Sequence, residues 1–319
     1  MGRGLLAGAL ALALVGLAGC EPGEGRYIDD TYFTDTQLVH QADVVYGEAP
    51  PLPDQSMPPG MERLLLDVVM PDPAVDAKTR RPAIVWIHGG GFKAGNKSAG
   101  STQAARWARR GYVAVTINYR LDQDNLCQNI QDGQSVPETE KQQCLDAIRA
   151  AQHDAQAAVR WLRHNADALQ IDPDDIAASG SSAGAVTALN LAYNAHDPGT
   201  SNPLTESSAI GAAVVYSGAA YGQLDPNYPP VADIGPGDAP TMDAHCTNDL
   251  AVDWNLTKAG IDAAVAAGLV AEYRLWSPPE FCAPGRVHGV DLLKDHAAEL
   301  NLAFTQFVYR HLELTQVED

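Results

Sequence analysis

The sequence has few basic residues: its 319 residues include 21 Lys and Arg against 40 Asp and Glu, which gives a formal net charge of −19 at pH 7. Nucleic-acid binding depends on basic patches that neutralise phosphates, so this balance argues against a nucleic-acid partner. It also disfavours anionic substrates and simple electrostatic adhesion to anionic membranes. The simplest interpretation of the acidic excess is solubility, and a salt-rich habitat would produce the same bias.

Patterns that bind metals or span membranes are missing as well. No Cys-x2-Cys or His-x3-His spacing occurs, so we expect no metal site and no other cofactor. The apolar run at residues 5–18 is too short to span a bilayer stably. Arg3 precedes this run and small residues end it, which is the pattern of a secretory signal peptide.

The signal-like segment ends in Leu-Ala-Gly-Cys, which resembles the bacterial lipobox. This resemblance implies cleavage before Cys20 and acylation of its thiol and new amino group. Two or three acyl chains make a durable anchor, because each buried CH₂ contributes about 0.8 kcal/mol. The alternative is an ordinary signal peptide with an incidental cysteine. We therefore expect an exported lipoprotein of the cell envelope, facing the periplasm or at the cell surface, with a signal peptide at residues 1–19 and a tether and N-terminal segment at residues 20–40.

Four cysteines remain after Cys20, and an even number in an oxidising compartment suggests two disulfides. Three pairings are possible. We favour Cys127–Cys144, which lies within one polar loop, together with Cys246–Cys282. The alternative is that these cysteines are free and buried.

Apolar strand-like runs alternate with helical patterns along the chain. Strands are predicted at residues 64–69, 84–87, 112–117, 176–179, 212–216, 240–245 and 270–276, and helices at residues 98–110, 147–168, 185–195, 257–267 and 294–314. Repeated β-then-α units with fully apolar strands indicate a parallel sheet that is covered on both faces. Such sheets place their sites at the carboxyl ends of the strands.

Residues 180–184 read Gly-Ser-Ser-Ala-Gly, between a predicted strand and a predicted helix. In this context a Gly-x-Ser-x-Gly pattern indicates a nucleophile elbow. Ser182 would lie on a tight strand-to-helix turn with a strained backbone. Gly180 and Gly184 would leave room for the adjoining strand and helix, because glycine has no Cβ.

A second motif, His-Gly-Gly-Gly-Phe at residues 88–92, follows the predicted strand at 84–87. With the elbow, it resembles the α/β-hydrolase superfamily and, within it, the carboxylesterases of the hormone-sensitive-lipase-like and bacterial feruloyl-esterase-like groups. The resemblance extends from about residue 64 to the C-terminus. It implies an α/β-hydrolase fold with a mostly parallel twisted sheet of about eight strands and helices on both faces. We expect one catalytic domain at residues 41–319, with insertions at 122–143 and 219–239 that act as a lid or as pocket walls.

The resemblance also assigns a triad in the chain order serine, acid, histidine. Asp249 lies in His-Cys-Thr-Asn-Asp-Leu-Ala-Val at residues 245–252, which is similar to the family's acid turn except that Cys246 stands where glycine is usual. The other interpretation of Asp249 is a helix N-cap or an Asx-turn. Asp243 and Asp253 are the fallback acids.

The remaining functional groups follow from the same resemblance. His288 lies between the last predicted strand and the last helix, the family's position for the base, and His296 is the alternative. The backbone N–H groups of Gly90, Gly91 and Ala183 would form the oxyanion hole. We expect His88 to hold the glycine loop through hydrogen bonds and Phe92 to pack beneath it. A phosphate-binding turn is the alternative for the glycines, but no Lys-Ser/Thr follows at P-loop spacing.

The predicted function is a serine carboxylesterase (nucleophile Ser182, acid Asp249, base His288) that acts on a small-molecule ester through an acyl-enzyme. Alternatives on the same fold are a peptidase, or a hydrolase of lactones, amides or formamides. A non-catalytic binding module is the alternative from a different class, although such modules typically lack a triad residue. The sequence assigns no oligomeric state.

Overall fold

The computed structural model describes residues 25–52, 60–122, 127, 137–195, 197, 199–219, 234–276, 282 and 287–315, without the side chains of 276 and 293–296. The predicted signal peptide, Cys20 and most of both predicted insertions lie outside the described residues. No helix in the described part of the chain is long and apolar enough to cross a membrane.

One sheet of eight strands organises the described residues, in the order β1-β2-β4-β3-β5-β6-β7-β8. β1 pairs with β2 and β2 pairs with β4 in antiparallel fashion, and every other pair is parallel. The strands are β1 (Leu38–Ala49), β2 (Glu62–Pro71), β3 (Arg81–Ile87), β4 (Val113–Ile117), β5 (Ile171–Ser181), β6 (Ala212–Tyr216), β7 (Thr241–Cys246) and β8 (Ala271–Trp276). The predicted α/β-hydrolase fold with a mostly parallel sheet is confirmed.

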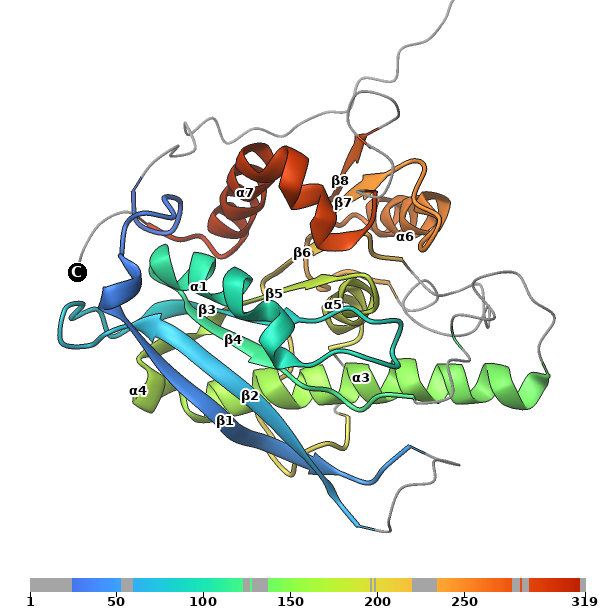
Figure 1. The fold of residues 1–319 in the computed structure, drawn as a ribbon, viewed down its shortest axis with the longest axis horizontal. Coiled ribbons are helices and arrows are strands. Elements are labelled where there is room, and N and C mark those ends of the chain that lie inside the picture. Colours follow the sequence, from blue (N-terminus) through green and yellow to red (C-terminus); the bar gives the residue numbers. More distant parts are fainter. Residues whose placement is uncertain are drawn as a thin grey trace, which may run out of the picture.

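Helices cover both faces of this sheet, as Figure 1 shows. They are α1 (Ser101–Arg109), α3 (Glu138–His164), α4 (Ala166–Leu169), α5 (Ala183–Tyr193), α6 (Trp254–Ala266) and α7 (Leu292–His311), with short 3-10 turns η1 (Asp35–Gln37), η2 (Lys97–Gly100) and η3 (Gly289–Asp291). Alternate residues of a strand point to opposite faces. Val85 of β3 therefore joins the core beneath α3 and α5, whereas its neighbours Ile84 and Trp86 join the core beneath α1 and α7.

Two elements differ from the sequence prediction. β1 was not predicted, because most of its residues are partly or fully exposed and form no apolar run. α3 begins at Glu138, inside the predicted insertion at 122–143, although the predicted helix begins at residue 147. Its first turns are polar and show no apolar period, but Glu138 and Glu140 suit a helix N-terminus, where negative charge is favourable.

The N-terminal segment packs on the domain. Tyr27 and Phe33 are buried in the core beneath α1 and α7. The N–H of Tyr27 donates to the carbonyl of Arg110 at 2.7 Å, and Arg26 forms a buried ion pair with Asp76 at 2.6 Å. The folded domain therefore begins before residue 41, the boundary expected from the sequence.

Both of the favoured disulfides are present. Cys127 is bonded to Cys144 of α3, with the Cα atoms 5.0 Å apart. Cys246, the last residue of β7, is bonded to Cys282, with the Cα atoms 6.0 Å apart. The second bridge ties the end of β7 to the chain segment that precedes His288.

Candidate active site

Ser182 lies between the end of β5 and the start of α5, where its backbone has φ 56° and ψ −123°. A side chain larger than glycine rarely adopts this conformation, so the surroundings must impose it. Two hydrogen bonds do so. The N–H of Ser182 donates to the carbonyl of Tyr216 in β6 at 2.9 Å, and its carbonyl accepts from Val186 at 3.0 Å.

The two flanking glycines have no room for a side chain. A Cβ on Gly184 would lie 2.1 Å from the carbonyl oxygen of Ile87 and 2.5 Å from that of His88. A Cβ on Gly180 would lie 2.3 Å from the carbonyl oxygen of Gly184. The elbow therefore presses the start of α5 directly onto the end of β3, as the glycine spacing predicted.

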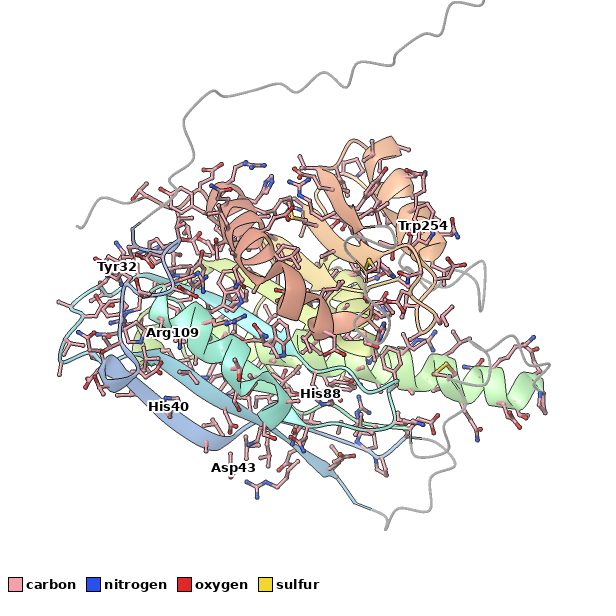
Figure 2. All side chains as sticks on the ribbon, turned by 45° about the horizontal axis from the view of Figure 1, so that its top comes forward. Tyr32, His40, Asp43, His88, Arg109 and Trp254 are labelled. Carbon is pink, nitrogen blue, oxygen red and sulfur yellow. A yellow bond between two sulfur atoms is a disulfide. The ribbon has the colours of Figure 1, made fainter. Side chains whose placement is uncertain are left out.

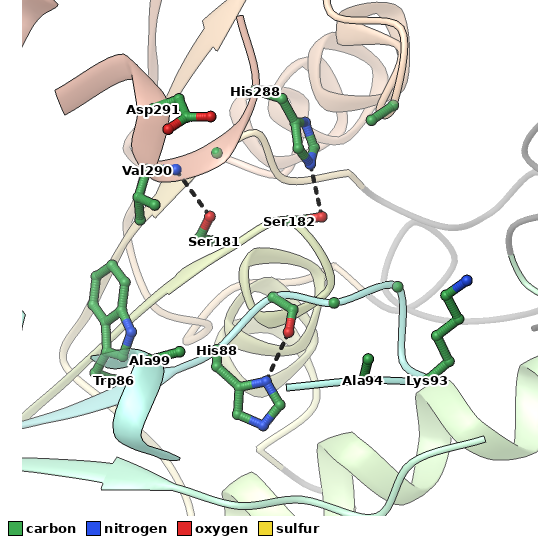
Figure 3. A pocket seen from close by; sticks show the side chains of 15 residues that line it. Trp86, His88, Lys93, Ala94, Ala99, Ser181, Ser182, His288, Val290 and Asp291 are labelled. Carbon is green, nitrogen blue, oxygen red and sulfur yellow. Dashed lines mark hydrogen bonds between the residues drawn. The ribbon is translucent and has the colours of Figure 1, made fainter. Parts of the chain in front are cut away.

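A continuous hydrogen-bonded chain links Ser182 to a histidine and a carboxylate. His288 Nε2 is 2.9 Å from Ser182 Oγ, a contact drawn in Figure 3. His288 Nδ1 is 2.7 Å from Asp249 Oδ2. The side chain of His288 is 29% exposed, whereas that of Asp249 is fully buried, so the histidine faces the solvent-accessible side of the chain.

Asp249 makes further bonds that fix its orientation. Its Oδ1 accepts the N–H groups of Ala251 at 2.9 Å and Val252 at 3.1 Å, which is the Asx-turn geometry considered above, and Oδ2 is left for His288. Burial alone would raise the pKa of Asp249, but the hydrogen bond and charge of His288 hold this pKa below its usual range. The carboxylate is therefore ionised at neutral pH.

The fallback residues lie elsewhere. Asp253 is the N-cap of α6, where its side chain accepts the N–H of Asn255 at 3.0 Å. Asp243 is fully buried within β7 and contacts His245. His296 belongs to α7, but its side chain is outside the described residues.

Two serines that the sequence reasoning did not assign to the site brace the loop that carries His288. Ser217 Oγ accepts the N–H of Gly289 at 2.9 Å, and the Ser217 hydroxyl also hydrogen-bonds to Asp249. Ser181 Oγ accepts the N–H of Val290 at 3.1 Å (Figure 3). The sequence signal that could have identified them was their position, because Ser217 follows β6 and Ser181 ends β5, at the edge of the sheet where the site lies.

The predicted oxyanion donors lie on two segments next to Ser182. Ala183 begins α5, where the first N–H groups of a helix have no partner within the helix. Gly90 (φ 121°) and Gly91 (φ 62°) lie on the loop after β3 in conformations that favour glycine, and both line the cavity at Ser182.

His88 and Phe92 support the glycine loop from within. His88 Nδ1 donates to the carbonyl of Gly89 at 2.7 Å, and the ring stacks on Tyr119 with centroids 4.3 Å apart. Burial lowers the pKa of His88, so its ring is neutral at pH 7. Phe92 is buried, with its ring edge toward Tyr119. Both residues hold the loop, as expected.

A cavity of about 560 Å³ opens beside Ser182 and His288. Trp86, Ala99 and Val290 contribute to its walls, between the start of α1 and the start of α7 (Figure 3). This volume is in the range of small-molecule sites. Among the described residues, no group of three or more His, Cys, Asp or Glu side chains is placed to hold a metal ion.

The chain is similar to a known protein family and to a solved esterase structure. The family model BD-FAE matches residues 66–136 and 142–225, just under half of the chain. The propionate-bound esterase Est2 of Thermogutta terrifontis superposes with a TM-score of 0.62 and 21% sequence identity, covering 88% of this chain and 96% of that one. The chain is thus similar to this family over those residues, and the superposition shows an α/β-hydrolase fold.

Curated relatives with esterase names match a shorter stretch. Gut esterase 1 of Caenorhabditis briggsae is 32% identical over 143 residues, which are 43% of this chain and 23% of that protein. Para-nitrobenzyl esterase of Bacillus subtilis (strain 168) is 32% identical over 111 residues, which are 34% of this chain and 21% of that protein. The chain thus matches less than a quarter of the length of these relatives.

The elbow glycines provide a test of this packing. We expect Gly184→Ala to lower the free energy of unfolding by about 3 kcal/mol or more, because its Cβ meets backbone atoms that cannot turn aside. Gly91→Ala is the matched control: no atom lies within 4 Å of its Cβ position, so only backbone strain of about 1–2 kcal/mol applies. Urea unfolding followed by circular dichroism measures both, and equal losses would contradict the proposed contact.

Proposed function

We propose that this protein is a carboxylesterase that hydrolyses small-molecule esters, with Ser182 as nucleophile, His288 as general base and Asp249 as the acid of the triad. The hydrogen-bonded chain from Asp249 through His288 to Ser182 supports this assignment more than any other observation. The esterase names of the relatives favour ester substrates among the possible acyl compounds.

In the first step, His288 Nε2 takes the hydroxyl proton of Ser182 as Oγ attacks the ester carbonyl carbon. The carbonyl oxygen becomes an oxyanion, which the N–H groups of Gly90, Gly91 and Ala183 receive. Each such donor contributes about 2.7–4 kcal/mol to the transition state. The ionised Asp249 stabilises the imidazolium that forms and holds its ring in the required tautomer.

In the second step, the imidazolium of His288 gives its proton to the leaving alkoxide, and the C–O bond to the alcohol breaks. The acyl group remains bonded to Ser182 Oγ. Water then attacks the acyl carbon while His288 accepts its proton, and collapse of this second intermediate releases the acid and restores the serine.

The cavity beside Ser182 supports a small substrate. Its volume of about 560 Å³ suits a compact ester, and its apolar walls include Trp86 and Val290. A hydrophobic acyl or alcohol group therefore fits beside Ser182 better than a charged one, in keeping with the acidic composition of the chain.

We also propose that the protein is exported and anchored through lipid on Cys20. The two disulfides support an oxidising compartment. Mass spectrometry of the N-terminal peptide of the membrane fraction should find an acylated Cys20 as the first residue. An unmodified Cys20 inside an uncleaved leader would contradict the anchor.

Replacement of the nucleophile tests the proposed reaction. Ser182→Ala should lower the turnover of short-chain aryl esters such as 4-nitrophenyl butyrate by about a million-fold, because no other group can form the acyl-enzyme. Circular dichroism should show an unchanged fold, since the side chain lost is small.

The matched control is Ser207→Ala, which removes an exposed hydroxyl that caps a local turn. This variant should retain full turnover. Activity retained in Ser182→Ala would contradict the mechanism, and a folded wild-type protein that hydrolyses none of the esters would favour the binding-module alternative.

A further inference from the structure

A second carboxylate–histidine pair lies next to the pair formed by Asp249 and His288. Asp243 and His245 belong to β7 and are both fully buried. His245 Nδ1 is 3.5 Å from Asp243 Oδ1, and His245 Nε2 is 3.5 Å from Asp249 Oδ2. The ring of His245 therefore lies between two carboxylates, one of which also binds His288.

The hydrogen bond of Nε2 fixes one proton of this ring. His245 Nε2 is 2.9 Å from the carbonyl oxygen of Val252. A carbonyl oxygen can only accept, so Nε2 must carry hydrogen and donate it. This bond holds the same turn whose Val252 N–H donates to Asp249.

The surroundings of Nδ1 fix the second proton. His245 Nδ1 is 3.1 Å from the hydroxyl oxygen of Thr257 in α6. Thr257 donates its only hydroxyl proton to the carbonyl of Gly218, so toward Nδ1 its oxygen can only accept. The other polar atom near Nδ1 is the carboxylate oxygen of Asp243. A ring with an N–H on both nitrogens is an imidazolium.

The nearby charges favour that state. Asp243 and Asp249 are the titratable groups that face His245. Tyr193 of α5 is near Asp243 as well, and burial together with the charge of Asp243 raises the pKa of Tyr193. Burial alone would lower the pKa of His245, but the nearby carboxylate of Asp243 outweighs it and raises this pKa above its usual value. Burial raises the pKa of Asp243, and two contacts oppose this rise: the charge of His245 and the N–H of Gly218, which donates to Asp243 Oδ2 at 2.9 Å.

We propose that His245 is a cationic positioning residue, held by Asp243, that fixes the 249–252 turn and keeps Asp249 ionised and aligned on His288. The assignment rests on the proposed role of Asp249 as the triad acid. His245 touches no substrate and acts only through Asp249. Its positive charge opposes the binding of a further proton by the triad.

The protonation state can be observed without any activity measurement. The measurement is NMR of the full-length protein with ¹⁵N-labelled histidine, in which the ring-nitrogen signals of His245 are assigned through bonds from its backbone. At pH 7, both ring nitrogens of His245 should carry hydrogen. A ring nitrogen without hydrogen would overturn the proposal. This result stands whether or not the protein hydrolyses esters, so it separates the role of His245 from the proposed function.

Two variants test the positioning role. His245→Gln keeps a donor but not the charge, and Asp243→Asn removes the partner that keeps His245 cationic. Each should lower kcat/KM for an aryl ester about 10- to 100-fold. His245→Gln should also move the acid limb of the kcat/KM profile to higher pH by about one unit, because loss of the cation favours protonation of the triad, whereas Asp243→Asn removes one charge of each sign and should move the limb less.

The control is His40→Gln on β1, where His40 is exposed (Figure 2). It should change neither value. A loss of activity in His245→Gln with an unmoved acid limb would show a merely structural role and overturn the proposal. If the variants do not fold, the ring-nitrogen measurement on the wild-type protein still decides it.

Discussion

The backbone of Ser182 is the constraint on which the rest of the site depends. Its φ of 56° and ψ of −123° carry strain on the order of 1–3 kcal/mol, which persists only where the surroundings impose it. Here the imposing contacts come from β6, through the carbonyl of Tyr216, and from β3, whose end meets Gly184. The same turn sets the Ser182 hydroxyl 2.9 Å from His288 Nε2.

The groups of the site come from the carboxyl ends of neighbouring strands. The glycine loop follows β3, Ser217 follows β6, and Asp249 follows β7. The Ser217 hydroxyl hydrogen-bonds to both Asp249 and the N–H of Gly289, next to His288. The disulfide between Cys246 and Cys282 joins the segments that precede Asp249 and His288. The buried carboxylate of Asp249 depends on these hydrogen bonds to stay ionised, because burial alone would raise its pKa.

Much of this arrangement is predictable from the sequence, for physical reasons. The central parallel strands contain long apolar runs, so they stand out, and Gly90, Gly180 and Gly184 have no room for a Cβ. β1 was missed because its exposed residues break any apolar pattern. The contacts of Ser217 and His245 depend on partners distant in the chain. One local signal was available: Asp243 and His245 are two residues apart in a strand and so share a face.

The central claim is that Ser182 is an activated nucleophile, and covalent labelling tests it most directly. A fluorophosphonate probe should form one adduct per folded chain, and peptide mapping by mass spectrometry should place the adduct on Ser182. The reaction should depend on His288, because removal of that base leaves an ordinary serine hydroxyl. A folded protein that forms no adduct, or one labelled at a different residue, would contradict the account.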